Sequence, residues 1–167
     1  MLIGVMRTFK KEVVGAVISS EDDRILMGTK APGSAGVYAD YWILPGGVVD
    51  DGDSPEETIY TEIVDETGLD LRGHPLNLID DQGADVAPLT LTTGEVIAFD
   101  MTFSIYGFYI AQRHKEIDVV AGDELDRLKW AEIGDLTSYN LCPPSITLFK
   151  RLGYISSVGA NALEARA

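Results

Sequence analysis

The chain has 167 residues, of which 46% are apolar and 24% charged, so it suits one globular domain and is too apolar for a disordered chain. Its 13 basic and 27 acidic residues give a formal net charge of −14, which disfavours nucleic acid polymers and anionic membrane surfaces as partners. Only a concentrated basic patch would reverse this conclusion, and the densest basic runs, at 10–11 and 150–151, are two residues long.

Short apolar runs rich in β-branched residues predict the first strands. Residues 13–19 and 24–28 flank an acidic turn and should form a hairpin. Residues 30–40 are rich in Gly, Ala and Pro and predict a loop. A short strand is expected over 41–44, ended by Pro-Gly-Gly, and an acidic loop is expected over 48–53.

The clearest predicted element is a helix that begins after Ser54. Ser54 is a good N-cap, Pro55 suits the first helical position, and Glu57 completes a capping box with Ser54. Ile59 recurs four residues later as another isoleucine, so one side of the helix can be buried. Gly68 is a natural C-terminal stop.

The remaining elements complete an α/β pattern. Strands are expected near 76–80, 96–99, 103–111 and 128–131, and a last helix should open at the Pro-Pro pair and end at Gly153. Strands on both sides of a central helix, with a second helix at the end, predict a mixed sheet between helices. We expect a single domain over residues 1–155 and a flexible tail over 156–167.

The sequence also favours a cytoplasmic protein. Cys142 is the only cysteine, so no intrachain disulfide is possible. Residues 1–14 lack the long apolar region and the cleavage site of a signal peptide. The most apolar later stretch, 103–111, is about half as long as a bilayer requires.

Three acidic residues of the predicted helix point to a metal. Glu62, Asp65 and Glu66 lie at i, i+3 and i+4, which puts their carboxylates on one face, and no Lys or Arg lies within the helix. A divalent cation would remove their repulsion, and oxygen ligands without His or Cys favour Mg²⁺ or Mn²⁺ over Zn²⁺. Taken alone, the pattern is also compatible with an exposed acidic face that binds nothing.

The loop before the helix adds to this arrangement. Gly46 and Gly47 have no Cβ, so the backbone can approach a ligand closely and offer a carbonyl to a metal. Asp50, Asp51 and Asp53 crowd the same end. Such a cluster could hold one to three metals against a phosphate chain and orient a water molecule.

Read as one unit, the loop and helix resemble the Nudix box. The segment from Gly47 to Leu69 is similar to G-x5-E-x7-R-E-U-x-E-E-x-G-U, and the lead-in W-x-L-P-G-G, from Trp42, also resembles that family. The resemblance implies an α/β/α sandwich with a mixed β-sheet and a loop–helix–loop metal site. It also implies hydrolysis of a diphosphate linkage in a nucleoside diphosphate derivative or a nucleoside triphosphate.

The resemblance also implies roles for individual residues. Glu62 and Glu66 would be the catalytic residues and the principal Mg²⁺ ligands, although family members differ on whether the residue at Glu62 is a ligand or the base that activates water. Asp65 and the carbonyl of Gly46 would be further ligands, and Asp53 would lie at the edge of the metal cluster. A later acidic ligand precedes a Trp in several members, which favours Glu124, six residues before Trp130.

Three positions depart from the family pattern. Asp53 and Asp65 stand where the box has Glu, and each is shorter by about 1.5 Å. Thr61 stands where the box has Arg, and its hydroxyl can donate a hydrogen bond but cannot supply the positive charge. Lys30 or Arg72 could take that role. The departures also support a second hypothesis, a Nudix-fold nucleotide-binding module with little catalysis.

Substrate contacts are expected from the loop before the box. Lys30 and Tyr41 are the substrate-binding candidates, since a Tyr can stack on a base for about 1–3 kcal/mol. Tyr38 and Trp42 flank the same turn, and Trp42 could instead belong to the core. Specificity should lie in residues 30–40 and 83–95. A homodimer is expected from family analogy alone.

Overall fold

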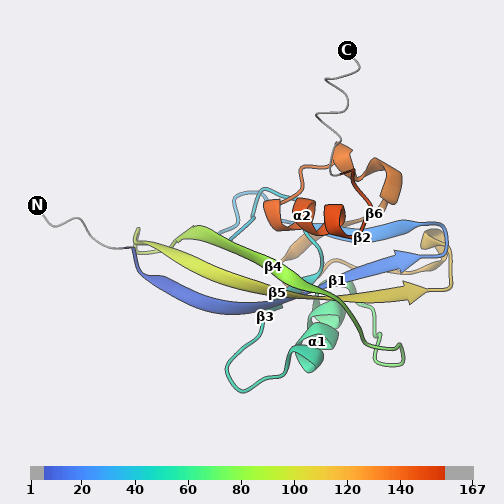
Figure 1. Ribbon diagram of the computed structural model, residues 1–167, viewed down its shortest axis with the longest axis horizontal. Helices are drawn as coiled ribbons and strands as arrows, with labels where there is room; N and C mark the ends of the chain where they lie inside the picture. The colour runs from blue at the N-terminus through green and yellow to red at the C-terminus, as the bar shows by residue number, and fades with distance from the viewer. Residues whose placement is uncertain (1–5, 157–167) are drawn as a thin grey trace, which may run out of the picture.

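The computed structural model describes residues 6–156, which form one mixed β-sheet with a helix against each face (Figure 1). The strands follow the order β4-β5-β1-β2-β6, with β3 paired to β1 beside this path. β1 and β5 are parallel over thirteen registered residue pairs, and the other pairs are antiparallel. The strands are β1 (Thr8–Ser20), β2 (Arg24–Lys30), β3 (Gly46–Val48), β4 (Asn77–Thr90), β5 (Val96–Ile110) and β6 (Leu125–Glu132).

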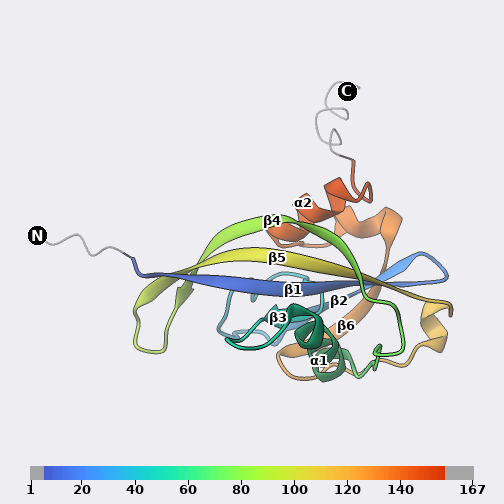
Figure 2. The same cartoon turned by 60° about the horizontal axis from the view of Figure 1, so that its bottom comes forward.

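The two α-helices lie on opposite sides of the sheet, as Figure 2 shows. They are α1 (Pro55–Thr67) and α2 (Pro143–Arg151), and two short 3₁₀ helices, η1 (His114–Glu116) and η2 (Ile133–Ser138), flank β6. This arrangement confirms the α/β/α sandwich with a mixed sheet. Within residues 6–156, no helix is long and apolar enough to cross a membrane.

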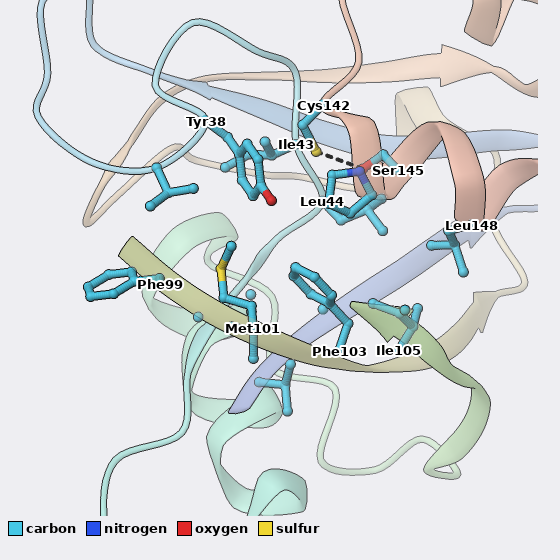
Figure 3. A pocket seen from close by; sticks show the side chains of 18 of the residues that line it. Tyr38, Ile43, Leu44, Phe99, Met101, Phe103, Ile105, Cys142, Ser145 and Leu148 are labelled. Atoms are coloured by element: carbon cyan, nitrogen blue, oxygen red, sulfur yellow. Dashed lines mark hydrogen bonds between the residues drawn. The ribbon is translucent and has the colours of Figure 1, made fainter. Parts of the chain in front are cut away.

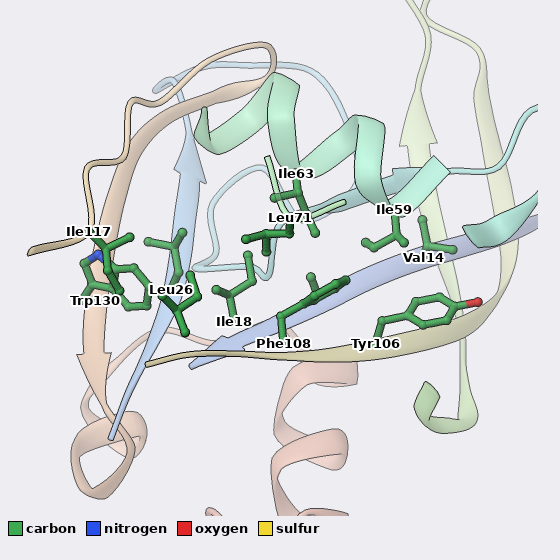
Figure 4. Packing of buried hydrophobic residues seen from close by; sticks show 12 residues of the cluster. Val14, Ile18, Leu26, Ile59, Ile63, Leu71, Tyr106, Phe108, Ile117 and Trp130 are labelled. Atoms are coloured by element: carbon green, nitrogen blue, oxygen red, sulfur yellow. The ribbon is translucent and has the colours of Figure 1, made fainter. Parts of the chain in front are cut away.

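Alternating side chains of the central strands form a separate core on each face of the sheet. On the α1 face, Ile59 and Ile63 are fully buried against Val14 and Ile18 of β1 (Figure 4). On the α2 face, Phe149 is fully buried and belongs to a cluster with Val17, Ile25, Met27 and Leu148. Each helix is therefore fixed by apolar contacts, which leaves the polar side of α1 free for chemistry.

Four expected strands differ from the structure, those at 41–44, 76–80, 96–99 and 103–111. β4 continues to Thr90 through register shifts, and the strands expected at 96–99 and 103–111 are one strand, because β4 and β5 pair along almost their whole length. Residues 41–44 form only isolated bridges, and the strand of this region lies at Gly46–Val48 instead, where β1 offers a pairing edge. Apart from Ser156, the tail expected at 156–167 lies outside the described residues.

Candidate functional site

Local sequence signals set the position of α1, as expected. The side chain of Ser54 accepts a hydrogen bond from the Glu57 amide at 3.1 Å, which forms half of the predicted capping box. Gly68 adopts a left-handed conformation with φ of 76°, and its amide donates to the carbonyl of Val64. With its apolar side held against β1, the helix presents its acidic side toward the glycine turn at the start of β3.

Glu66 is held directly by that turn. Its side chain is only 3% exposed, and Oε1 accepts a hydrogen bond of 2.7 Å from the amide of Gly46. A Cβ at Gly46 would come within 2.0 Å of the Val14 carbonyl oxygen, and one at Gly47 within 2.7 Å of Glu62 Cδ. Glycine is therefore required at Gly46 by close packing against the backbone of β1, whereas a side chain at Gly47 would displace the carboxylate of Glu62.

Three carboxylates meet beside this turn in what we call the acidic cluster, Glu62, Glu66 and Asp123, whose ligand oxygens lie within 4.8 Å of one another. Burial, together with the charges of neighbouring acids, raises the pKa of Glu62 to about 7. Burial likewise raises the pKa of Glu66 to about 8, although the Gly46 hydrogen bond opposes this shift. A bound cation would favour the charged forms, so the cluster has the donor set and electrostatics of a hard divalent-metal site.

Asp123 reaches the cluster because its loop caps the end of α1. The amides of Val120 and Gly122 donate to the last carbonyls of the helix, those of Thr67 and Glu66, at 2.9 and 3.2 Å. Asp123 itself has a positive φ of 52°, which turns the chain at this point. The loop therefore fixes a third acid next to the two on the helix.

The other predicted ligands lie outside this close group. Glu124 is exposed and approaches Lys30, with 3.7 Å between Oε2 and Nζ, although its charge also raises the pKa of Glu62 and Glu66. Asp65 is exposed, and its charge raises the pKa of Glu62. Asp53 is exposed in the acidic loop. Gly46 contacts the cluster through its amide, which donates to Glu66.

No basic residue replaces the missing arginine of the box by pairing with the cluster. In the part of the chain that the structure describes, no Lys, Arg or His forms an ion pair with Glu62, Glu66 or Asp123. Arg72 pairs with Asp70 instead, and Thr61 is exposed. The cluster is therefore an uncompensated group of acids, which strengthens the argument that a cation belongs there.

A cavity of about 340 Å³ opens beside the acidic cluster. Figure 3 shows its two walls: Phe99, Met101, Phe103 and Ile105 project from β5, and Tyr38 lies opposite them. Tyr38 belongs to the segment 31–45, which we call the strap and which links β2 to β3. One end of the cavity is polar and is lined by residues of the cluster region, namely Lys30, Gly46, Gly47, Glu66 and Glu124.

Of the two tyrosines of the strap, Tyr38 reaches the cavity and Tyr41 does not. Tyr38 lines the cavity, whereas Tyr41 packs edge-to-face against it with 6.3 Å between ring centroids. Trp42 packs against Tyr139 and the core of the α2 face. Sequence reasoning favoured Glu124 and Tyr41 over the nearby Asp123 and Tyr38, because residues of the same type close together in sequence carry the same local signal.

Comparison with known proteins agrees with the fold and the box. The family model described as the NUDIX domain matches residues 10–152. Among curated proteins, none matches the chain by sequence. The structure resembles the MutT protein from Methanosarcina mazei Go1, with a TM-score of 0.66 and 21% identity, covering 89% of this chain and 95% of that protein.

Two further solved structures are similar at lower identity. The E. coli dihydroneopterin triphosphate pyrophosphohydrolase gives a TM-score of 0.60 at 17% identity, covering 84% of this chain and 92% of that one. The NUDIX domain of Shewanella oneidensis NrtR, complexed with ADP ribose, gives 0.58 at 15% identity, covering 86% of each chain. The family match spans most of the chain and includes the glycine turn, α1 and the loop of Asp123; the chain therefore belongs to the NUDIX domain family.

Proposed function

We propose that the protein hydrolyses a diphosphate linkage in a nucleoside diphosphate derivative or a nucleoside triphosphate, with Mg²⁺ or Mn²⁺ as its cofactor. One observation carries this proposal: Glu66 belongs both to the acidic cluster and to the lining of the adjacent cavity. A substrate whose organic part fills the cavity would thus bring its phosphates to the carboxylates. Since the protein is strongly acidic, a cation is needed for such a charged substrate to bind.

Glu62, Glu66 and Asp123 are the residues that would hold the metal, with Asp65, Asp53 and the carbonyl of Gly46 as the further ligands that the family resemblance implies. When bound, Mg²⁺ would neutralise the diphosphate and stabilise the charge that develops on the leaving phosphate. The Gly46 amide fixes the Glu66 carboxylate in place, so that ligand would need little reorganisation.

We assign the proton transfer to Glu62. Its side chain is less buried than that of Glu66, so a water molecule can reach its carboxylate, and a carboxylate kept charged by a nearby cation can accept a proton. As the oxygen of water bonds to one phosphorus, Glu62 accepts the proton of that water, and the bond from this phosphorus to the bridging oxygen breaks. The leaving phosphate departs with the electrons of that bond.

Lys30 is the candidate for binding the phosphates. Its amine lies in the cavity lining, donates to the Val37 carbonyl at 3.2 Å, and is 3.7 Å from Glu124. The Lys30 side chain is only 13% exposed, so its charge is poorly screened by water. We infer that Lys30 neutralises a phosphate oxygen at the polar end of the cavity. This chain has Thr61 in place of the arginine of the Nudix box and therefore lacks the positive charge of that arginine.

The similar structures support a diphosphate substrate but differ in the organic group. Their names refer to dihydroneopterin triphosphate in one case and to bound ADP ribose in another. We therefore test a panel of nucleoside triphosphates, ADP ribose, dinucleoside polyphosphates and nucleotide sugars, each with Mg²⁺, Mn²⁺ or EDTA. Product analysis should show multiple turnovers on at least one class with metal and none with EDTA.

The same panel tests the alternative of a nucleotide-binding module, which Thr61 motivates. Tight binding by calorimetry, together with the absence of products at every metal concentration, would contradict the hydrolase and support the module. The predicted homodimer rests on family analogy, and light scattering on the purified chain would test it.

A further inference from the structure

Tyr38 occupies a backbone conformation that is costly for an aromatic residue. Its φ is 62°, in the left-handed region that glycine and asparagine favour and that is strained for other residues. Its ring nevertheless turns into the cavity (Figure 3), and its hydroxyl donates a hydrogen bond to Asp85 of β4. The ring is therefore fixed at both ends, by the strained backbone and by the hydroxyl contact.

The wall opposite Tyr38 is a nearly continuous apolar surface. Phe103 and Met101 project from β5 across the cavity from the Tyr38 ring, and Ile43 and Leu44 extend the strap side (Figure 3). The space between a fixed ring and a flat sheet surface suits a planar group. It does not suit a branched or strongly hydrated one, because few polar atoms line it.

Away from the polar end with Lys30 and Glu66, the polar side chains that line the cavity are paired within the protein. Arg151 donates two hydrogen bonds to Asp80, at 2.7 and 2.8 Å, and the Asp80 side chain is only 6% exposed. Cys142 Sγ lies 3.2 Å from Ser145 Oγ. An occupant of the cavity thus meets mainly carbon, and its contact energy should come from stacking and shape rather than from hydrogen bonds.

Taken together, the geometry points to Tyr38 as the specificity-determining residue of this site: its ring covers a planar nucleobase against Met101 and Phe103, and Asp85 is the positioning residue that holds the ring. This inference rests on the proposed function for the identity of the base. It assigns the stacking contact to Tyr38, away from Tyr41. It also assigns Asp85 a role through Tyr38 rather than a direct contact with the base.

The direct test uses methyl NMR and needs no catalysis. The chain contains four methionines, of which Met101 lines the cavity and Met27 is fully buried outside its lining. We label the methionine methyl groups with ¹³C, assign Met101 with Met101→Leu, and titrate the protein in saturating Mg²⁺ with AMP, GMP, CMP and UMP, which have no diphosphate linkage to hydrolyse. Stacking above Met101 should shift its methyl signal upfield, while Met27 stays unchanged. Ribose 5-phosphate, which has no base, should produce no ring-current shift.

Variants then identify the stacking residue. Tyr38→Ala should weaken binding of the best monophosphate on the order of tenfold, as expected for the loss of one base–aromatic stack. Tyr38→Gly removes the same ring while relieving the backbone strain, so equal weakening in that variant excludes a folding defect. Tyr41→Ala is the matched control and should bind as the original protein does. Equal binding by the Tyr38→Ala and original proteins would overturn the assignment, as would a Met101 signal that no monophosphate shifts.

A double-mutant cycle tests the positioning role of Asp85. Tyr38→Phe and Asp85→Asn should each weaken binding by a similar, smaller factor, and the double variant should be no weaker than either single one. Additive losses would show that Asp85 contacts the base directly and would overturn its positioning role. A failure of the proposed function would give a different result, because the Met101 methyl signal would still shift in a protein that hydrolyses no compound of the substrate panel.

Discussion

The acidic cluster and the cavity share Glu66 but are built on opposite electrostatic principles. In the cluster, Glu62, Glu66 and Asp123 converge without a basic partner among the described residues. In the rest of the cavity wall, by contrast, polar side chains pair with one another, as in the two hydrogen bonds from Arg151 to Asp80. The cluster therefore needs a cation to neutralise its carboxylates, whereas the paired side chains of the cavity wall need no further partner.

This difference gives the two regions separate roles: the cluster would bind the metal and the phosphates, and the cavity would select the organic group of the substrate. An unpaired group of buried acids costs stability and is retained where it binds or reacts. A self-satisfied cavity adds to the stability of the fold and can discriminate only by shape and stacking. Substitutions in the cluster should therefore change chemistry with little loss of stability, whereas substitutions of the paired polar side chains in the cavity wall should lower stability with little change in chemistry.

The largest effect is expected from neutralising the acids of α1. Glu62→Gln and Glu66→Gln should each lower turnover by roughly 10²–10⁴-fold, because each removes a charged oxygen from the reacting site while keeping the shape of the side chain. Glu57→Gln, on the same helix but outside the cluster, is the control and should retain full activity. Product release under saturating Mg²⁺ measures the rates, and circular dichroism checks the fold. Unchanged turnover in both variants would contradict the assignment of the cluster as the active centre.

A smaller effect should separate Asp123 from its neighbour Glu124. Asp123→Asn should raise the Mg²⁺ concentration needed for half-maximal activity by at least roughly tenfold, since it removes a ligand oxygen of the cluster. Glu124→Gln should leave that concentration nearly unchanged and act mainly through its contact with Lys30. Metal titrations of activity compare the two variants. The reverse order would favour Glu124 as the third ligand.

The stability of the metal-free protein should depend on pH in the direction set by the acids. The pKa values of Glu62 and Glu66 are raised from 4.5 to about 7 and about 8. The folded state therefore binds more protons than the unfolded state at pH values from 4.5 up to about 8. Stability should therefore fall as pH rises through this range, by a Tm change on the order of 5 °C. Calorimetric scans with EDTA should show the fall, and Mg²⁺ or Glu66→Gln should reduce it. A Tm that rises over this range would refute the expectation.

The smallest predicted effect lies in the cavity wall. Asp80→Asn should lower the free energy of unfolding by about 1–2 kcal/mol, because it breaks the charged hydrogen bonds with Arg151, which are partly exposed to water. The Mg²⁺ requirement should stay the same. Denaturant unfolding measures the change, with Asp81→Asn, at an exposed neighbour, as the control. Equal stability of the two variants would show that the pair contributes nothing to the wall.

The cluster and the cavity also differ in how far the sequence predicts them. Helix α1, its cap at Ser54 and its stop at Gly68 follow from signals within a few residues, so the turn and the acidic side of the helix were predictable. The choice between Asp123 and Glu124 was not, because it depends on the positive φ of Asp123 and on where the loop meets the helix.

The cavity was still harder to predict. Its walls come from the strap and from β5, which lie far apart in sequence and face each other only because β4, β5 and β1 pair over long distances. Alternation of apolar residues does not report such pairing, so β4 was expected to end near residue 80. For the same reason Tyr38 and Tyr41 could not be distinguished, since only the strained backbone of Tyr38 directs its ring inward.

The docking of the loop onto the end of α1 has a consequence for how this protein can diverge. Two amides, of Val120 and Gly122, dock on consecutive carbonyls at the end of α1, and a Cβ at Gly122 would lie 2.5 Å from the Asp65 carbonyl oxygen. The number of residues from Val120 to Asp123 therefore sets the position of Asp123 relative to the end of α1. Relatives should tolerate insertions around η1, whereas a single residue added between Val120 and Asp123 would carry the third acid away from its partners.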